Sequence, residues 1–346
     1  MSKAMQANKK LSMQGKILGM GNALVDLIFQ LPSDELLEKW ALPKGSMTLI
    51  DQQQAGVILN YFGQTQPVLA TGGSASNTIT SIAALGGHCG FIGQIGKNDI
   101  YGDFYIEHLT NHGITPYFKR IETPTGTAIT LMSPDTERTF ATYLGAACSM
   151  TEENIRPEIF SQYGYFHIEG YMVQNYALLE KALQTANQCG MVISLDLASY
   201  NIVKSHLEFI RHILPMVDVV FANEEEALAF TGKDSLQALN LLAGQVAVAV
   251  IKLGSRGSIV MHRGKLHTID ADKVVKTDSN GAGDSYAAGF LYGMSRGLGV
   301  QECGEIASTV ATQVVQVTGP KLTAAQWREL LPRIRKIEER NTRWLE

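Results

Sequence analysis

Short apolar runs that alternate with helical stretches constrain the fold of this chain more than any other feature. The runs lie at residues 165–168, 191–195, 217–222 and 247–253, and stretches such as 177–188 between them have helical periodicity. Because the runs show no regular polar alternation, they are typical of strands buried on both faces, with helices as the connections. The sequence therefore predicts an α/β fold with a mostly parallel central sheet and helices on both faces.

The domain organisation is predicted to be a single unit with a short tail. The chain has 346 residues, of which 45% are hydrophobic, and this is enough for one large core. Residues 1–14 lack hydrophobic periodicity and are expected to be a flexible tail, so the domain spans 15–346. Residues 126–132 and 137–143 alternate around a Ser-Pro-Asp turn, which indicates a β-hairpin among the βα units.

Charge, cysteine spacing and hydropathy narrow the class of partner. The net charge of −4 does not favour general binding to nucleic acid or to an anionic membrane. Cys89, Cys148, Cys189 and Cys303 lack Cys-x-x-Cys spacing, so neither a zinc site nor a disulfide framework is predicted. No apolar segment is long enough for a signal peptide or a membrane span. We expect a cytoplasmic protein, monomeric or homodimeric, that acts on a small molecule.

A glycine turn in residues 276–290 is the strongest candidate for chemistry. It joins a short β-like run, residues 273–277, to a helix of small residues through Gly281 and Gly283. Glycine lets an anion approach the main chain, and the free amides and dipole at a helix N-terminus favour negative charge there. Asp284, in the first helical turn, is suited to take a proton from a hydroxyl that attacks phosphorus. The alternative is an ordinary cluster of helix-capping residues.

Two earlier stretches carry candidate ligand-binding residues. Gly72 and Gly73 precede a helix of small residues and let a ligand approach the backbone, while Asn77 offers both a donor and an acceptor to a sugar hydroxyl. An ordinary cap on a tightly packed helix is the alternative. Asp26 lies among apolar residues, and a buried carboxylate is costly without a partner. We expect Asp26 either to meet a buried donor or to bind the hydroxyls of a ligand.

Together these motifs resemble a known family. Asp278-Ser-Asn-Gly-Ala-Gly-Asp284, followed by Ser-Tyr-Ala-Ala-Gly, resembles the C-terminal signature of the PfkB (ribokinase-like) carbohydrate and nucleoside kinases, and residues 71–87 resemble the N-terminal one. Ser279 replaces the usual threonine of the family but keeps a hydroxyl. The resemblance implies that Asp284 is the base, and that the amides of Gly281, Ala282, Gly283 and Asp284 form an anion hole. No P-loop motif is present.

The resemblance also implies a lid and a nucleotide site. It implies a small inserted β-sheet that closes over the substrate, from about residues 24–50 and 114–143. Arg138 lies in a lid strand and is placed to reach the transferred phosphoryl group, unless it is a plain surface arginine. Asn223 and Glu226 have the Asn-x-x-Glu spacing that holds a water and Mg²⁺ network in the family, with Glu226 a ligand through water. Glutamates at a helix start are the alternative. On the ATP side we place these two residues together with Lys252, Gly254, Gly257, Asp278 and Asn280.

The expected cofactors are therefore ATP and Mg²⁺, with a monovalent cation such as K⁺ beside Asp278 as a further option. The acceptor is expected to be a purine nucleoside, because residues 21–26, 72–77 and 143–148 resemble the adenosine-kinase-like branch. Asn22 and Ser74 belong to these stretches, and Tyr171 is placed to stack on a base. Three alternatives stay open: a sugar kinase for ribose, fructose or a related carbohydrate, a non-catalytic ligand-binding relative, and an NAD-dependent dehydrogenase. The dehydrogenase would use the Gly19-x-Gly21 turn, which lacks a third glycine.

Overall fold

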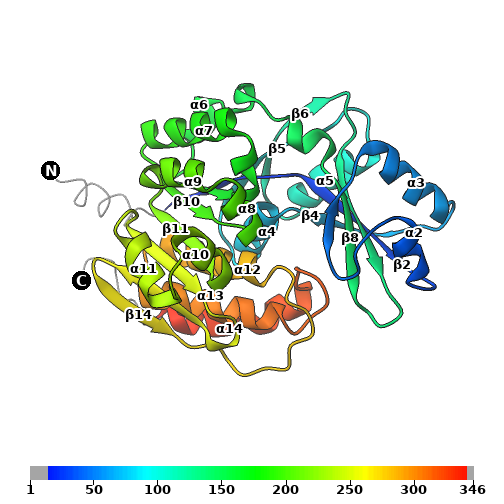
Figure 1. Ribbon diagram of the computed structural model, residues 1–346. Coiled ribbons are helices and arrows are strands. Elements are labelled where there is room, and N and C mark those ends of the chain that lie inside the picture. The colour runs from blue at the N-terminus through cyan, green and yellow to red at the C-terminus, as the bar shows by residue number, and fades with distance from the viewer. Residues whose placement is uncertain (1–14, 341–346) are drawn as a thin grey trace.

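A nine-stranded sheet forms the centre of the protein, in a computed structural model that describes residues 15–340 (Figure 1). The expected tail, residues 1–14, lies outside the described residues. The strand order is β14-β13-β12-β11-β10-β9-β1-β5-β6. In chain order the strands are β1 (Ile17–Met20), β5 (Cys89–Gly96), β6 (Thr115–Ile121), β9 (Tyr165–Glu169), β10 (Val192–Asp196), β11 (Val219–Asn223), β12 (Val248–Lys252), β13 (Ser258–His262) and β14 (Lys265–Ile269).

The pairing confirms the expected mostly parallel sheet. Neighbours from β6 to β12 pair in parallel, and only the β12-β13 and β13-β14 pairs of this sheet are antiparallel. The expected helix at 177–188 is α7 (Tyr176–Gln188). Because parallel strands need crossover connections, helices cover both faces and bury two separate apolar clusters.

One cluster lies under α4 (Ser74–Ala84), α5 (Ile100–Asn111), α12 (Ala282–Ser295), α13 (Val300–Val314) and α14 (Ala324–Glu338). The other lies under α6 (Pro157–Phe160), α7, α9 (Leu207–Ile213), α10 (Glu224–Thr231) and α11 (Ser235–Ala243). Here α8 (Tyr200–Ser205) packs against α10. No helix within residues 15–340 is long and apolar enough to cross a membrane.

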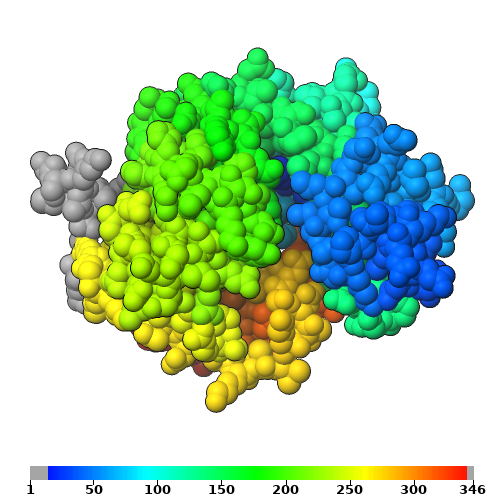
Figure 2. All heavy atoms as spheres, viewed as in Figure 1, coloured from blue at the N-terminus to red at the C-terminus, as the bar shows by residue number. Residues whose placement is uncertain are grey.

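A second sheet of five strands lies beside the first, next to α2 (Glu35–Lys39) and α3 (Gln52–Phe62) (Figure 1). Its order is β3-β8-β7-β2-β4, with β2 (Leu24–Gln30), β3 (Met47–Leu49), β4 (Val68–Gly72), β7 (Gly126–Met132) and β8 (Arg138–Tyr143). Strands β7 and β8 pair antiparallel, which confirms the expected hairpin. Figure 2 shows the surface hollowed between the blue segments that include the small sheet and the green and orange segments, which belong to the larger part of the molecule around the main sheet.

Three expectations about strands need correction. The expected lid segment 114–143 includes β6, but β6 pairs with β5 in the large sheet. Strand β4, which the expected lid omits, pairs with β2 in the small sheet. Residues 273–277 form no strand, and the side chain of Val275 is 87% exposed. In each case the residue pattern indicates an extended chain, whereas the choice of partner strand depends on tertiary contacts that lie far away in the sequence.

Candidate active site

A cavity of about 540 Å³ lies between the two sheets, at the carboxyl ends of the parallel strands. This is where ligands collect in open α/β sheets. Polar side chains reach it from the ends of four strands of the large sheet: Glu169 from β9, Asp196 from β10, Asn223 from β11 and Lys252 from β12. The small sheet contributes Leu24, Asp26, Met47, Leu49, Phe140 and Thr142 to the opposite wall.

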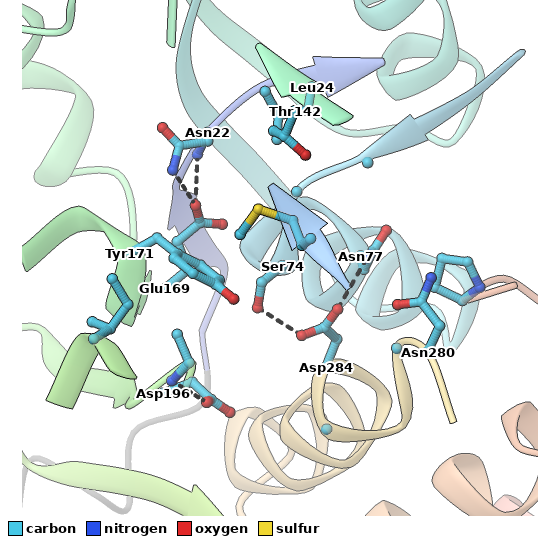
Figure 3. A pocket seen from close by; sticks show the side chains of 18 of the residues that line it. Asn22, Leu24, Ser74, Asn77, Thr142, Glu169, Tyr171, Asp196, Asn280 and Asp284 are labelled. Atoms are coloured by element: carbon cyan, nitrogen blue, oxygen red, sulfur yellow. Dashed lines mark hydrogen bonds between the residues drawn. The ribbon is translucent and has the colours of Figure 1, made fainter. Parts of the chain in front are cut away.

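Asp284 lines this cavity. Its carboxylate accepts hydrogen bonds from Ser74 Oγ at 2.6 Å and from Asn77 Nδ2 at 2.9 Å (Figure 3). Both donors belong to the first turns of α4, so the fold brings the two glycine turns of the sequence together. Burial raises the pKa of Asp284, and the two hydrogen bonds oppose that rise. A partly buried carboxylate of raised pKa, open to a cavity, is suited to accept a proton.

The turn before Asp284 has the features of an anion site. Gly281 has a φ of 74°, and a Cβ at this position would collide with Pro320. A Cβ on Gly283 would lie 3.1 Å from Lys252 Nζ, so the ammonium group lies directly beside the turn. Lys252 pairs with Asp196 at 2.8 Å, and it stays charged because Asp196 and Glu226 outweigh the effect of burial on its pKa. The amide of Ala282 donates to the Ser279 carbonyl at 3.2 Å and is therefore not free in this conformation.

Arg138 and Asp278 join the small sheet to the segment before this turn. Arg138 Nη1 lies 3.0 Å from Asp278 Oδ2, and Asp278 also accepts from the amides of Asn280 and Gly319. Burial alone would raise the pKa of Asp278, but these amides and Arg138 hold it below its usual value. Arg138 is therefore no plain surface arginine. It lies against Asp278, six residues before Asp284.

The Asp26 carboxylate lines the cavity without a hydrogen-bond donor among residues 15–340. A Cβ on Gly72 would lie 2.8 Å from Asp26 Oδ1, so the glycine lets the backbone pass close to this group. Burial raises the pKa of Asp26 to about 6, although Lys321 and Arg138 lower it. The expected alternative of a buried donor is not met, and the carboxylate remains available to ligand hydroxyls.

Asn77 has a partner within the protein that the sequence did not indicate. Its amide nitrogen donates to Asp284, while its Oδ1 atom is buried and has no partner among the described residues. Ser74, from the same helix, also contacts Asp284, and Gly73 lines the cavity. Asn77 is thus first a partner of the carboxylate, and only its oxygen is left for a ligand or a water molecule.

Glu169 is a cavity residue that the motif comparison missed. It is 1% exposed and accepts from the Asn22 amide at 2.9 Å and from Asn22 Nδ2 at 2.8 Å (Figure 3). It also accepts from the Ala75 amide at 2.8 Å. Burial raises its pKa to about 7 despite these donors. Glu169 therefore fixes both Asn22 and the start of α4. The available signal was a charged residue at the end of an apolar run, which also applies to Asp196.

On the expected ATP side, the same two residues cap a helix and line the cavity. Asn223 and Glu226 form a reciprocal capping box at the start of α10, and both line the cavity. Glu226 is 2% exposed, and burial raises its pKa. Gly254 lines the cavity at a φ of 60°, but Gly257 does not line it. A Cβ on Gly257 would collide with the Ile269 carbonyl, so this glycine serves the turn between β12 and β13.

Apolar side chains form the wall beside Asn22. Tyr171, in the short turn η3 (Gly170–Gln174) after β9, lines the cavity opposite Leu24 of the small sheet (Figure 3). Burial raises the pKa of Tyr171. A further cavity of about 290 Å³ adjoins this wall and shares four lining residues with the first: Asn22, Leu144, Tyr171 and Gln174. No group of three metal-ligating side chains occurs within residues 15–340.

Comparison with known proteins decides the family. Residues 59–327 match the family described as pfkB family carbohydrate kinase. The chain belongs to this family. A probable sugar kinase from Rhizobium etli CFN 42 superposes with a TM-score of 0.82 at 27% identity, covering 94% of this chain and 99% of that one. The adenosine kinase from Sinorhizobium meliloti gives a TM-score of 0.81 at 29% identity, covering 93% and 99%.

Adenosine kinase 1 of Arabidopsis thaliana is 24% identical over 332 residues, which cover 88% of this chain and 95% of that protein. These matches confirm the ribokinase-like fold and support the adenosine-kinase-like branch of the pfkB family. The protein is therefore a phosphotransferase with an alcohol group as acceptor. Membership in this kinase family implies the use of ATP. The dehydrogenase and non-catalytic alternatives are therefore set aside.

Proposed function

We propose that this pfkB kinase transfers the γ-phosphoryl group of ATP to the hydroxymethyl group of a purine nucleoside, with Asp284 as the general base. The observation that carries the proposal is the position of the Asp284 carboxylate. It lies in the cavity between the two sheets, held by Ser74 and Asn77, at the N-terminus of α12. The ammonium group of Lys252 lies next to Gly283 in the same turn.

The proposed reaction is an in-line displacement. The acceptor hydroxyl gives its proton to the Asp284 carboxylate while its oxygen bonds to the γ-phosphorus, and the bond from that phosphorus to the bridging oxygen of ADP breaks. Lys252 and the amides at the start of α12 stabilise the charge on the transferred group. Arg138 sits at 3.0 Å from Asp278 and enters the same region from the small sheet, which closes as a lid in this proposal.

Glu226 would hold Mg²⁺ through water, because both of its carboxylate oxygens already accept hydrogen bonds from Asn223. The metal would supply positive charge to the β- and γ-phosphates. Gly254 and Asn280 line the same cavity and complete the proposed ATP side. The expected site for K⁺ beside Asp278 fits less well, since that carboxylate already has two amide donors and Arg138 as partners. No step is derived through a monovalent cation.

The choice of a nucleoside over a free sugar rests on the presence of both polar and apolar side chains in the cavity lining. Asn22 and Asp26 offer polar groups suited to ribose hydroxyls, whereas Leu24, Leu144 and Tyr171 offer an apolar slot suited to a base. The sugar alternative is supported by the similarity to the probable sugar kinase. The two acceptors differ in their use of the apolar side chains. A free sugar has hydroxyls on nearly every carbon and gains little from contact with them, whereas a base can pack against them.

ADP release with adenosine, guanosine, inosine, ribose and fructose tests the proposal. We expect kcat/KM for at least one purine nucleoside to exceed the values for both sugars by tenfold or more. A higher value for a free sugar would contradict the nucleoside acceptor and leave the kinase assignment in place. A cytoplasmic location and a monomer or homodimer stay predictions, which fractionation and light scattering would check.

A further inference from the structure

Lys321 lies outside every motif discussed so far, but it bridges the two sheets at the candidate site. It follows α13 and comes directly after Pro320, which packs against Gly281 of the anion turn. Its Nζ atom donates to both the carbonyl and the hydroxyl oxygen of Thr71 in β4 of the small sheet. The side chain therefore joins the segment that supports the turn before Asp284 to the strand that leads into α4.

The hydrogen bonds from Lys321 reach the backbone segment that lies between the Asp26 and Asp284 carboxylates. Thr71 precedes Gly72, which passes beside the Asp26 carboxylate, and Gly73, after which α4 supplies Ser74 to Asp284. A shift of Thr71 would consequently move the backbone beside Asp26 and the donors to Asp284 together. The partner Thr71 is 1% exposed, so its carbonyl has little access to water if the bridge is lost.

The charges around Lys321 come from three elements. Asp26 on β2 and Asp284 on α12 both favour its charged form, and His108 on α5 is the neighbouring base. Asp284 in turn faces Asp196, Glu169 and Lys252, while Asp26 also faces Arg138. Burial lowers the pKa of Lys321 to about 8, although the two carboxylates oppose this. Lys321 is therefore charged at neutral pH and loses its charge at mildly alkaline pH.

We propose that Lys321 is a positioning residue for phosphoryl transfer: through its bonds to Thr71 it holds the Thr71–Gly73 corner against the anion turn, and it brings a positive charge to the side of the cavity that holds Asp26 and Asp284. The inference rests on the proposed roles of Asp284 as base and Asp26 as the acceptor-binding carboxylate. Two consequences follow from the geometry. Loss of the charge makes both carboxylates harder to ionise, and loss of the bond to Thr71 loosens the contact between the sheets.

Lys321→Met keeps the length of the side chain and removes its charge and its donors. We expect kcat to fall about tenfold or more, which is part of the ~10²–10⁴-fold that a positioned general base contributes. We expect the acid limb of kcat/KM to move to higher pH by about one unit, because an opposite charge at close range lowers a carboxylate pKa by about 1–3 units. Lys321→Arg, which retains the charge, should restore the acid limb. Lys233→Met, on an exposed lysine, is the matched control and should change neither quantity.

A direct titration separates this inference from the proposed function. The carboxyl groups of Asp26 and Asp284 are followed by NMR in ¹³C-aspartate-labelled protein without substrate, with Asp26→Asn and Asp284→Asn used for assignment. The inference predicts that Lys321→Met raises both pKa values while Lys321→Arg leaves them near those of the wild type. Unchanged pKa values in folded Lys321→Met would overturn the inference, whether or not any nucleoside is phosphorylated.

Should Lys321→Met fail to fold, the Arg variant and the wild type still decide the matter. Because burial lowers the pKa of Lys321 to about 8, we expect the amide signals of residues 71–74 to shift with a midpoint near pH 8 in the wild type. In Lys321→Arg this transition should be absent, since arginine does not titrate there. A transition that persists unchanged in Lys321→Arg, or its absence from the wild type, would contradict the inference.

Discussion

Replacement of Asp284 by asparagine tests the assigned base with little change of shape. The carboxylate accepts from Ser74 at 2.6 Å and from Asn77 at 2.9 Å. In the variant the amide oxygen can keep the bond from Asn77, and the Ser74 hydroxyl can rotate to accept from the new NH₂ group. Burial already disfavours the charged carboxylate, so a neutral amide there should cost little folding stability.

The catalytic effect of Asp284→Asn should be much larger than the structural effect. A general base contributes about 10²–10⁴-fold in rate, equivalent to about 2.7–5.4 kcal/mol of the barrier at about 1.36 kcal/mol per factor of ten. We therefore expect kcat to fall by at least 10²-fold. The dissociation constant for ATP should stay within about threefold, because the amide cannot accept the proton but leaves the nucleotide walls in place.

The assay is continuous ADP release with a saturating purine nucleoside, together with calorimetric titration of ATP and thermal unfolding. Asp272→Asn is the matched control, since it makes the same chemical change at an exposed residue that pairs with Arg333 and does not line the cavity. A kcat for Asp284→Asn within about fivefold of the wild-type value would refute the base assignment. If Asp284→Asn lowers both the affinity for ATP and the thermal stability, the asparagine amide does not replace the carboxylate without disturbing the site.

Three further predictions concern the acceptor, pH and the apolar wall. Asp26→Asn should raise KM for the acceptor about 10- to 100-fold with little change in KM for ATP, because hydrogen bonds to a charged group are worth about 1.5–3 kcal/mol. An equal rise of KM for both substrates would show that Asp26 does not belong to the acceptor site alone. In the wild type, kcat/KM for the acceptor should fall as the pH drops through about 6, since burial raises the pKa of Asp26 to about 6. The protonated group loses the negative charge that strengthens its bonds to hydroxyls, and one of its oxygens becomes a donor. A flat profile from pH 5 to 7 contradicts this. Tyr171→Ala should reduce the preference for a nucleoside over ribose, as stacking on a base is worth about 1–3 kcal/mol, and an unchanged ratio would remove Tyr171 from the base slot.

The sequence predicted the elements of this fold better than their pairing. Strands β9 to β12 and helix α7 lie within a few residues of the expected ranges, because apolar runs and helical periodicity are local properties. The sheet to which β4 and β6 belong was not predictable in this way: β4 lies in the small sheet and β6 in the large one. Both segments are extended, and only their partner strands differ. The apolar residues Val274 and Val275 suggested a strand, but no neighbouring strand edge accepts them.

The candidate site shows the same division between local and distant information. The motifs predicted that Asp284 and Gly283 belong to the catalytic turn and Ser74 to the substrate side, and the structure places all three around one cavity. The bond from Ser74 to Asp284 spans 210 residues, and no local pattern indicates it. Glu169 and Lys321 were missed for a related reason: each acts through a backbone or side-chain partner in another segment, and such a partner is visible only in three dimensions.

The proposed reaction of this pfkB kinase is phosphorylation of a nucleoside hydroxymethyl group by way of Asp284. The most direct measurement is ³¹P NMR of a reaction that contains ATP, Mg²⁺ and adenosine, with the Asp284→Asn variant as the comparison. We expect a 5′-monophosphate signal that grows in step with ADP in the wild type and is lost in the variant. Release of inorganic phosphate without a nucleoside monophosphate, or equal product from both proteins, would contradict it.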